Sequence, residues 1–232
     1  MIPLHDINPT SRPPVVTLAL VIVNALAFVF ELLLGEPGRT QLVYALGMVP
    51  GRVTLFPVSP EISAVDAFLP LLTSMFLHGG WLHVTGNMWF LWVFGDNIED
   101  RLGHGRFVVF YLLCGVLAGL AHTAVNLRSM IPAIGASGAV SGVMGAYLLL
   151  YPGSRVVTLV TLGLWWFKAS LPAYVMILYW FVVQLLSGTV SLGLREGGGG
   201  GVAWWAHIGG FIAGAVLVLI FKQPVRRTAL NQ

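Results

Sequence analysis

Long apolar runs separated by short polar stretches are the feature of this sequence that most restricts its fold. The first run, Val15 to Leu34, has the length of about 20 residues that a helix needs to cross a bilayer. Only 9% of the residues are charged, against about 25% in a soluble domain. The pattern predicts a polytopic protein with the lipid bilayer as its environment. A signal peptide has a shorter apolar core, so the first run is interpreted as a retained helix.

Six segments are predicted to cross the bilayer: residues 14–34, 82–98, 105–125, 137–151, 171–190 and 203–221. The predicted fold class is an all-α membrane protein, a six-helix bundle in one domain over residues 1–232. Its core covers about 14–222, with short tails on either side. Residues 35–81 contain several prolines but no full span, so they are predicted to lie on the membrane face or to dip into it.

Two further segments have apolar or glycine-rich compositions that do not predict a span. Residues 156–167 are interpreted either as interfacial or as an extension of the fifth span, and both readings stay open. The stretch 195–201 is predicted to be a flexible loop because it is mostly glycine.

The distribution of Lys and Arg predicts the orientation, because cytoplasmic loops of membrane proteins are enriched in both. With six spans, eight of these residues fall on the side that holds both termini and four on the other. Both termini are therefore expected in the cytoplasm, in a multi-pass protein of the cell membrane. Spans two, four and six then run from the outside inward.

Composition also argues against several partners and cofactors. The net charge is only +3 and no run is rich in Lys or Arg, so nucleic acid is not an expected partner. Cys114 lies alone in an apolar run and is interpreted as a buried, inert thiol. His78 and His83 could suggest a metal, but the chain has no HExxH motif and no carboxylate placed to help, so neither a metal nor another cofactor is expected.

Polar residues at similar depths in three predicted spans carry the functional signal. His83 and Asn87 lie in the first turns of the second span, Ser137 begins the fourth, and His207 lies one turn into the sixth. Polar groups inside a membrane are costly and usually face the bundle interior. A single such residue often has only a packing role. Convergence from three spans instead indicates a site near the outer ends of these helices.

Ser137 has the position that a nucleophile would need. The fourth span has only about 15 residues, or ~22 Å, so Ser137 is expected below the outer surface. The first peptide N–H groups of a helix are free, and its positive dipole end would point into a cavity there. A hydroxyl beside free N–H donors suits acyl transfer. Ser141, one turn later, is interpreted as a packing residue.

His207 is the candidate base for Ser137. Ala203, His207, Gly210 and Gly214 share one helix face, and Ser137, Ser141, Gly142 and Gly145 form a similar stripe on the fourth span. Stripes of small residues let two helices approach closely. No acidic residue falls inside the last three spans, which favours a Ser–His dyad over a triad. His83 and Asn87 share a face and can donate hydrogen bonds to an oxyanion.

Four stretches together resemble the rhomboid family of intramembrane serine proteases. They are "HGGWLHVTGN", "GDNIEDRLG", "GASG" and "AHIGGFIAG", in the order the family has them. The resemblance implies Ser137 as nucleophile, His207 as general base, and Asn87 and His83 as oxyanion donors together with the Ser137 backbone N–H. It also implies that Gly135 and Gly138 shape the serine turn, that His78 lies near a water-filled cavity, and that Glu99 and Arg101 are structural.

The resemblance further implies a six-helix core, a membrane-embedded first loop, and substrates that are transmembrane helices of other, single-span proteins. One position departs from the pattern. Some relatives carry an aromatic residue one turn after the serine, stacked on the histidine, where this chain has Ser141. The orientation of His207 is then expected to come from another group, such as the ring of Trp204 or Trp205. The sequence predicts no oligomeric state.

Two other functional classes compete with a protease. A transporter or channel also places polar residues in its spans, but repeated halves or charged intramembrane residues are typical of that class. Neither is found here. A catalytically inactive rhomboid-like binding protein is the closer rival, and such a protein is expected to lack the serine or the histidine. This chain has both.

Overall fold

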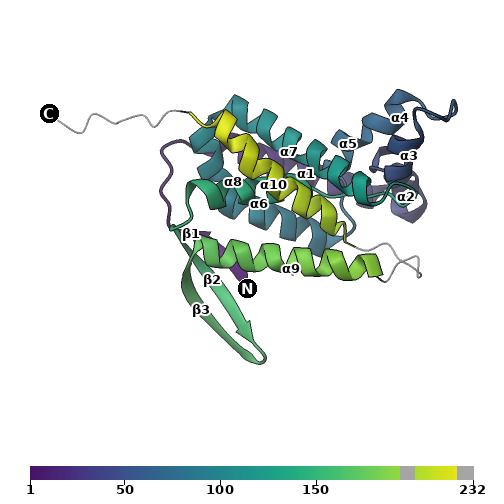
Figure 1. Cartoon of the computed structure of the whole chain (residues 1–232). Coiled ribbons are helices and arrows are strands. Elements are labelled where there is room, and N and C mark those ends of the chain that lie inside the picture. The colour runs from purple at the N-terminus through teal and green to yellow at the C-terminus, as the bar shows by residue number, and fades with distance from the viewer. Residues whose placement is uncertain (194–201, 224–232) are drawn as a thin grey trace.

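Helices occupy all six segments that were predicted from the apolar runs (Figure 1). The computed structural model describes residues 1–193 and 202–223, so the predicted loop at 195–201 lies outside the described residues. The six helices are α1 (Val15–Leu33), α6 (Trp81–Leu102), α7 (His104–Val125), α8 (Ser137–Leu150), α9 (Ala173–Gly193) and α10 (Trp204–Phe221).

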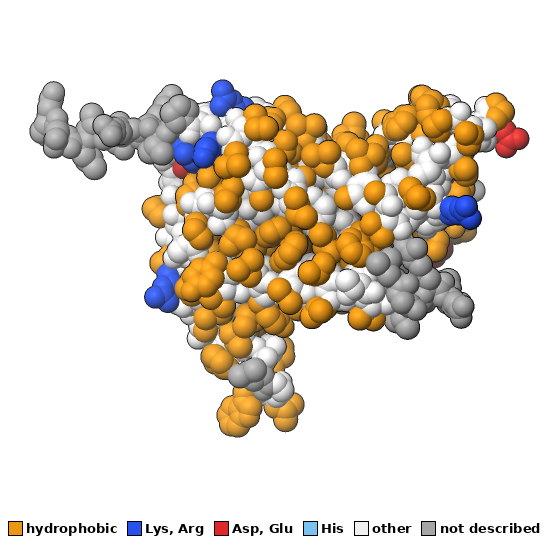
Figure 2. All heavy atoms as spheres, viewed as in Figure 1, with side chains coloured by type: hydrophobic (Ala, Val, Ile, Leu, Met, Phe, Trp, Pro, Cys, Tyr) orange, Lys and Arg blue, Asp and Glu red, His pale blue; other side chains and the backbone are white. Residues whose placement is uncertain are grey.

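Four of these helices are long and apolar enough to cross a bilayer. They are α1, α7, α10 and residues Ala173–Ser191 of α9. Helix α6 carries four charged residues near its end, and α8 has only 14 residues, so neither meets the same standard within the described chain. Figure 2 shows hydrophobic side chains spread across one face of the bundle, with charged side chains mainly toward its two ends. The protein is therefore a helical membrane protein.

The connection between α1 and α6 folds into short helices, and its backbone is hydrogen-bonded to the loop before α8. They are α2 (Gly35–Leu46), α3 (Pro50–Leu55), α4 (Ala64–Phe68), α5 (Pro70–Thr73) and the 3-10 helix η1 (Ser74–Phe76). Met48 and Ala133 exchange two backbone hydrogen bonds, of 3.0 and 2.7 Å. The backbone N–H of Gly51 donates to the carbonyl of Ser129 at 2.8 Å. These contacts fix the irregular segment that leads into α8.

A small antiparallel sheet makes the prediction of an all-α fold wrong. Its strands are β1 (Ile2–Asp6), β2 (Arg155–Leu162) and β3 (Trp165–Pro172), in the order β1-β2-β3. Residues 156–167 do not lengthen the fifth span, since α9 begins at Ala173. They belong instead to a hairpin that projects from the bundle (Figure 1). Val and Thr favour strands, and Gly163 supplies the positive φ of 59° that the two-residue turn needs.

Helix α10 lies at the centre of the packing and sets the distance between the helices that carry the polar residues. It packs most extensively against α8 and α7. A Cβ atom added to Gly214 would lie 1.9 Å from the carbonyl oxygen of Gly142, and one on Gly210 would lie 2.0 Å from that of Gly138. The stripes of small residues predicted on the two helices therefore meet in backbone contact. Helix α9 lies at the edge of the bundle in Figure 1.

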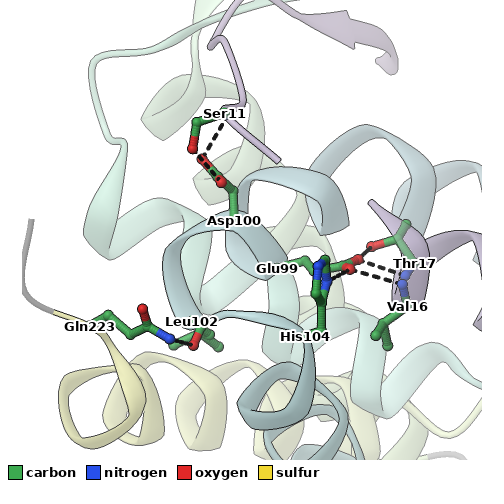
Figure 3. Close-up of polar contacts among 8 residues, drawn as sticks. All are labelled: Ser11, Val16, Thr17, Glu99, Asp100, Leu102, His104 and Gln223. Atoms are coloured by element: carbon green, nitrogen blue, oxygen red, sulfur yellow. Dashed lines mark hydrogen bonds and ion pairs between the residues drawn. The ribbon is translucent and has the colours of Figure 1, made fainter. Parts of the chain in front are cut away.

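Glu99 joins the end of α6 to the start of α1 (Figure 3). Its carboxylate accepts hydrogen bonds from the backbone N–H groups of Val16 and Thr17, at 2.8 and 2.7 Å, and from the Thr17 hydroxyl at 2.7 Å. A ring nitrogen of His104 lies 2.6 Å away. A carboxylate at a helix N-terminus satisfies free N–H groups and the positive end of the dipole. These contacts give buried Glu99 the structural role that the resemblance implied.

Candidate active site

Ser137 is the first residue of α8 and lines a cavity of about 530 Å³. The walls come from α6, the segment 131–134, α8, α9 and the start of α10. Helix α8 begins at Ser137 because the chain before it is irregular and is held by backbone hydrogen bonds to the α1–α6 connection. It ends at Leu150, since Pro152 follows shortly afterward and cannot continue a helix. The short helix thus presents its N-terminus and Ser137 to the cavity.

The two glycines beside Ser137 are required by the space around them. Gly135 has a φ of 123°, which is rare for other residues, and a Cβ atom there would lie 2.6 Å from Nε2 of His83. A Cβ atom on Gly138 would lie 2.6 Å from that of Ala118 on α7. Gly135 therefore allows the bent peptide before the serine. Gly138 allows α8 to approach its neighbour.

Ser137 and His207 meet in a hydrogen bond across the α8–α10 contact. Nε2 of His207 lies 2.8 Å from Oγ of Ser137, although the residues are 70 positions apart in sequence. His207 is 9% exposed. Ser141 donates its hydroxyl to the backbone carbonyl of Ser137 at 2.6 Å, as expected for a packing residue. The structure thus brings together the serine and the histidine that the sequence singled out.

Helix α9 supplies two contacts to His207 that sequence reasoning missed. Nδ1 of the ring lies 2.7 Å from Oε1 of Gln184, and the ring of Trp180 lies at 6.0 Å between centroids with a 33° tilt. Of the two rings expected to orient His207, Trp204 meets it edge-on at 6.1 Å. An amide inside an apolar span was the available signal for Gln184, which carries no charge and so was not among the acidic candidates for a third residue.

His83 lies on α6 with one ring nitrogen already occupied. The backbone N–H of Gly79 donates to Nδ1 of His83 at 3.2 Å. A neutral imidazole has one donor and one acceptor nitrogen, so the proton of this ring is on Nε2. Nε2 is also the atom that lies against Gly135, next to the serine turn. His83 can therefore donate a hydrogen bond on the Ser137 side of the cavity.

Asn87 lies one turn further along α6 and also lines the cavity. Its Nδ2 group is buried and has no hydrogen-bond acceptor in the part of the chain that the structure describes. A buried donor without an acceptor is costly and requires an explanation. A negatively charged oxygen in the cavity would provide the missing acceptor. The structure thus places both predicted oxyanion donors in the wall that Ser137 faces.

His78 lies next to His83, in the connection between η1 and α6. Its ring meets that of His83 edge-on at 5.2 Å and is fully buried. Its backbone N–H donates to Glu31 at 3.0 Å, and Arg39 donates to its carbonyl at 2.9 Å. Burial and the neighbouring His83 lower the pKa of His78 to about 4, so the ring is neutral at physiological pH.

Among the residues that the structure describes, the site consists of hydrogen-bonding side chains, and no ion pair lies at its centre. Within the described chain, the two ring nitrogens of His207 lie at hydrogen-bond distance from a hydroxyl and an amide. Within residues 1–193 and 202–223, no three His, Cys, Asp or Glu side chains are grouped so that they could hold a metal ion. The arrangement can pass a proton between Ser137 and His207 and can offer N–H donors to an oxygen beside them.

Comparison with known proteins decides the family. The model of the Rhomboid domain matches residues 66–224, which is most of the chain. The chain belongs to the rhomboid family. All four rhomboid-like stretches lie inside the matched range, and so do Ser137, His207, His83 and Asn87.

Several rhomboid relatives are similar to parts of the chain. The RHOMBOID-like protein 6, mitochondrial, of Arabidopsis thaliana is 32% identical over 66% of this chain and 44% of its own length. The Rhomboid protease GluP of Bacillus subtilis is 38% identical over 40% of this chain and 18% of its own. The Rhomboid-like protein 11, chloroplastic, of Arabidopsis thaliana is 31% identical over 68% and 54%. The chain thus spans about half of these relatives or less.

Proposed function

We propose that this rhomboid protein is an intramembrane serine endopeptidase that uses a Ser137–His207 dyad. The observation that carries the proposal is the 2.8 Å contact between Oγ of Ser137 and Nε2 of His207 at the wall of a cavity. Membership of a family that includes a protein named as a protease supports it further. A binding protein would need neither the contact nor the two N–H donors beside it.

In the proposed acylation step, Oγ of Ser137 attacks the carbonyl carbon of the scissile peptide bond. The hydroxyl proton passes to Nε2 of His207 as the new C–O bond forms, so the attacking oxygen carries no full negative charge. The carbonyl oxygen becomes an oxyanion. When the tetrahedral intermediate collapses, the C–N bond breaks and the leaving nitrogen takes the proton from His207.

Three N–H groups are proposed to stabilise the oxyanion. They are Nδ2–H of Asn87, Nε2–H of His83 and the backbone N–H of Ser137, which is free because it lies in the first turn of α8. Donors that are already oriented in a water-poor site stabilise developing charge without reorganising. The unpartnered Nδ2 of Asn87 fits this role because its acceptor would form only during the reaction.

Deacylation uses the same groups with water as the nucleophile. His207 accepts a proton from water as the water oxygen attacks the acyl carbon. The proton then returns to Oγ of Ser137, and the carboxylic acid product leaves. The cavity supplies the space that both the scissile peptide and a water molecule need. No cofactor enters this sequence of steps.

The proposed membrane topology follows from helix lengths and charge. We infer that α6 and α8 also cross, giving six spans, and that the α1–α6 connection is embedded in the membrane. Eight of the twelve Lys and Arg residues fall on the side of the two termini, which supports a cytoplasmic location for both in the proposed cell-membrane protein. The 14 residues of α8 then rise only ~21 Å, so Ser137 lies below the outer surface.

The proposed substrates are single-span membrane proteins cut near the outer end of the transmembrane helix. The carbonyls of a substrate helix are held in hydrogen bonds, so the helix must unwind locally before Ser137 can attack one. Unwinding costs least near the membrane edge and at Gly or Pro. A small residue at the cut fits beside the glycines around Ser137.

Purified protein in liposomes is expected to cut a panel of such substrates near their outer ends. Introducing Gly or Pro a few residues into the substrate helix should speed the cut, and a poly-Leu helix should suppress it. Mass spectrometry of the fragments gives the cleavage position. A cut near the cytoplasmic end, or equal cleavage of the poly-Leu substrate, would contradict the proposed orientation and the need for unwinding.

Asn87→Ala is expected to reduce kcat by about 10² to 10³, the usual effect of losing one oxyanion donor, with little change in substrate binding. Steady-state kinetics on folded, reconstituted protein tests this. Asn24→Ala is a matched control, because Asn24 is also a buried amide in a membrane helix but bonds the carbonyl of Leu20. Equal kcat values for Asn87→Ala and the wild type would remove Asn87 from the site.

A further inference from the structure

Gln184 contacts the only ring nitrogen of His207 that the proposed reaction leaves unused. Its Oε1 lies 2.7 Å from Nδ1, and the side chain is 6% exposed, in the middle of α9. The other ring nitrogen faces Ser137 at 2.8 Å. The imidazole is therefore held from both ends, by α8 on one side and by α9 on the other.

We propose that Gln184 is a positioning residue that fixes the tautomer and the orientation of His207, an inference that rests on the proposed role of His207 as base. Nε2 must be unprotonated to accept the Ser137 proton, so the proton of the neutral ring must be on Nδ1. A carbonyl oxygen at Nδ1 accepts that proton in a hydrogen bond and favours this tautomer. The opposite tautomer would point an N–H group at Oγ and block the transfer.

A neutral amide suits this position better than a carboxylate would. The site is buried in an apolar bundle, where an unpaired carboxylate would be costly while His207 is neutral. An amide oxygen bears no net charge, yet it bonds more strongly once the ring becomes an imidazolium. Gln184 can thus stabilise the charge that develops on His207 during attack without imposing a buried charge at rest.

The face of α9 is shaped to hold the ring in one orientation. Trp180, Gln184 and Gly188 follow at four-residue intervals and so lie on one side of the helix. The ring of Trp180 lies 6.0 Å from the His207 ring with a 33° tilt, while Gln184 contacts Nδ1 of the ring. A Cβ atom on Gly188 would lie 3.3 Å from that of Trp204, so the glycine allows α9 to approach α10.

Ser141 does not compete for the positioning role. Its hydroxyl is bonded to the carbonyl of Ser137, and it supplies no ring that could stack on the imidazole. The aromatic contact that the sequence lacks at this position comes from Trp180 on another helix. Gln184 adds the in-plane contact that a stacked ring cannot provide.

Two substitutions of similar length separate positioning from packing. Gln184→Met removes the acceptor, and kcat should fall roughly tenfold to a hundredfold, as expected for a hydrogen bond to a charged group. KM should stay within about twofold, because the substrate does not contact this side chain. Gln184→Glu keeps an acceptor for Nδ1–H and should recover most of the lost kcat. Thr189→Val, on the exposed face of α9, is the control.

Kinetics and thermal unfolding are measured together on liposome-reconstituted protein, with Gln184→Leu as a second apolar variant should Gln184→Met give little folded protein. Recovery of kcat by Glu but not by Met or Leu supports positioning. A wild-type kcat in folded Gln184→Met overturns the positioning role. So does a result in which all three variants lose activity only in proportion to their loss of folded protein. If the wild type shows no hydrolysis that depends on Ser137, the proposed function itself fails.

Discussion

Replacing Ser137 or His207 with alanine is expected to reduce proteolysis by about 10⁴ or more, because each removes one member of a unit that acts together. The double variant should be no worse than either single one. The close contact between α8 and α10 is made by glycine backbone rather than by these side chains, so both variants are expected to fold. Cleavage of a reconstituted substrate tests the loss of proteolysis. Thermal unfolding of the same samples tests whether the variants are folded.

Ser141→Ala is the matched control, because it removes a serine hydroxyl one turn further along α8. That hydroxyl bonds the carbonyl of Ser137, and losing one neutral hydrogen bond costs about 1 kcal/mol or less than tenfold in rate. Wild-type turnover by Ser137→Ala would mean that another group attacks the substrate. A loss of folded protein in that variant would instead point to a structural role for the serine.

Gly214→Val is expected to prevent the bundle from assembling and to abolish activity with it. A Cβ atom at position 214 would lie 1.9 Å from the carbonyl oxygen of Gly142, and backbone cannot rotate away as a side chain can. Overpacking a core costs about 1–3 kcal/mol when side chains adjust, and a backbone clash should reach or exceed the upper value. Any relaxation that separates α8 from α10 also separates Ser137 from His207.

Gly105→Val provides the comparison for this substitution. Gly105 is also helical, but a Cβ atom there meets nothing within 4 Å. The unfolding temperature and the activity of the Gly105→Val variant should stay close to those of the wild type. If Gly214→Val had the same unfolding temperature and activity as Gly105→Val, the close approach of α8 and α10 would not be what holds the site together.

The sequence predicted the helices and much of the candidate site because both leave strong local signals. Apolar runs located the six helices, and stripes of small residues identified the faces where α8 and α10 meet. Ser137 and His207 were conspicuous because reactive side chains are rare in apolar helices. Each of these signals is carried by a segment read on its own.

The features that were missed depend on partners that are distant in the sequence. The run 156–167 is apolar enough for a helix, but it forms strands in which β2 pairs with β3 and with β1 at the N-terminal end of the chain. Gln184 carries no charge, so only its 2.7 Å approach to His207 distinguishes it from an ordinary polar residue of a span. Glu99 was identified only through the family resemblance, because its contacts are with α1, more than 80 residues earlier.

Fluorophosphonate labelling followed by peptide mass spectrometry tests the nucleophile directly. The reagent modifies a serine only where a base activates it, so it reports on the Ser137–His207 pair without requiring a known substrate. We expect one adduct on the reconstituted wild type, at Ser137, that is absent from Ser137→Ala and from folded His207→Ala. An adduct at another residue, or equal labelling of His207→Ala, would contradict the dyad.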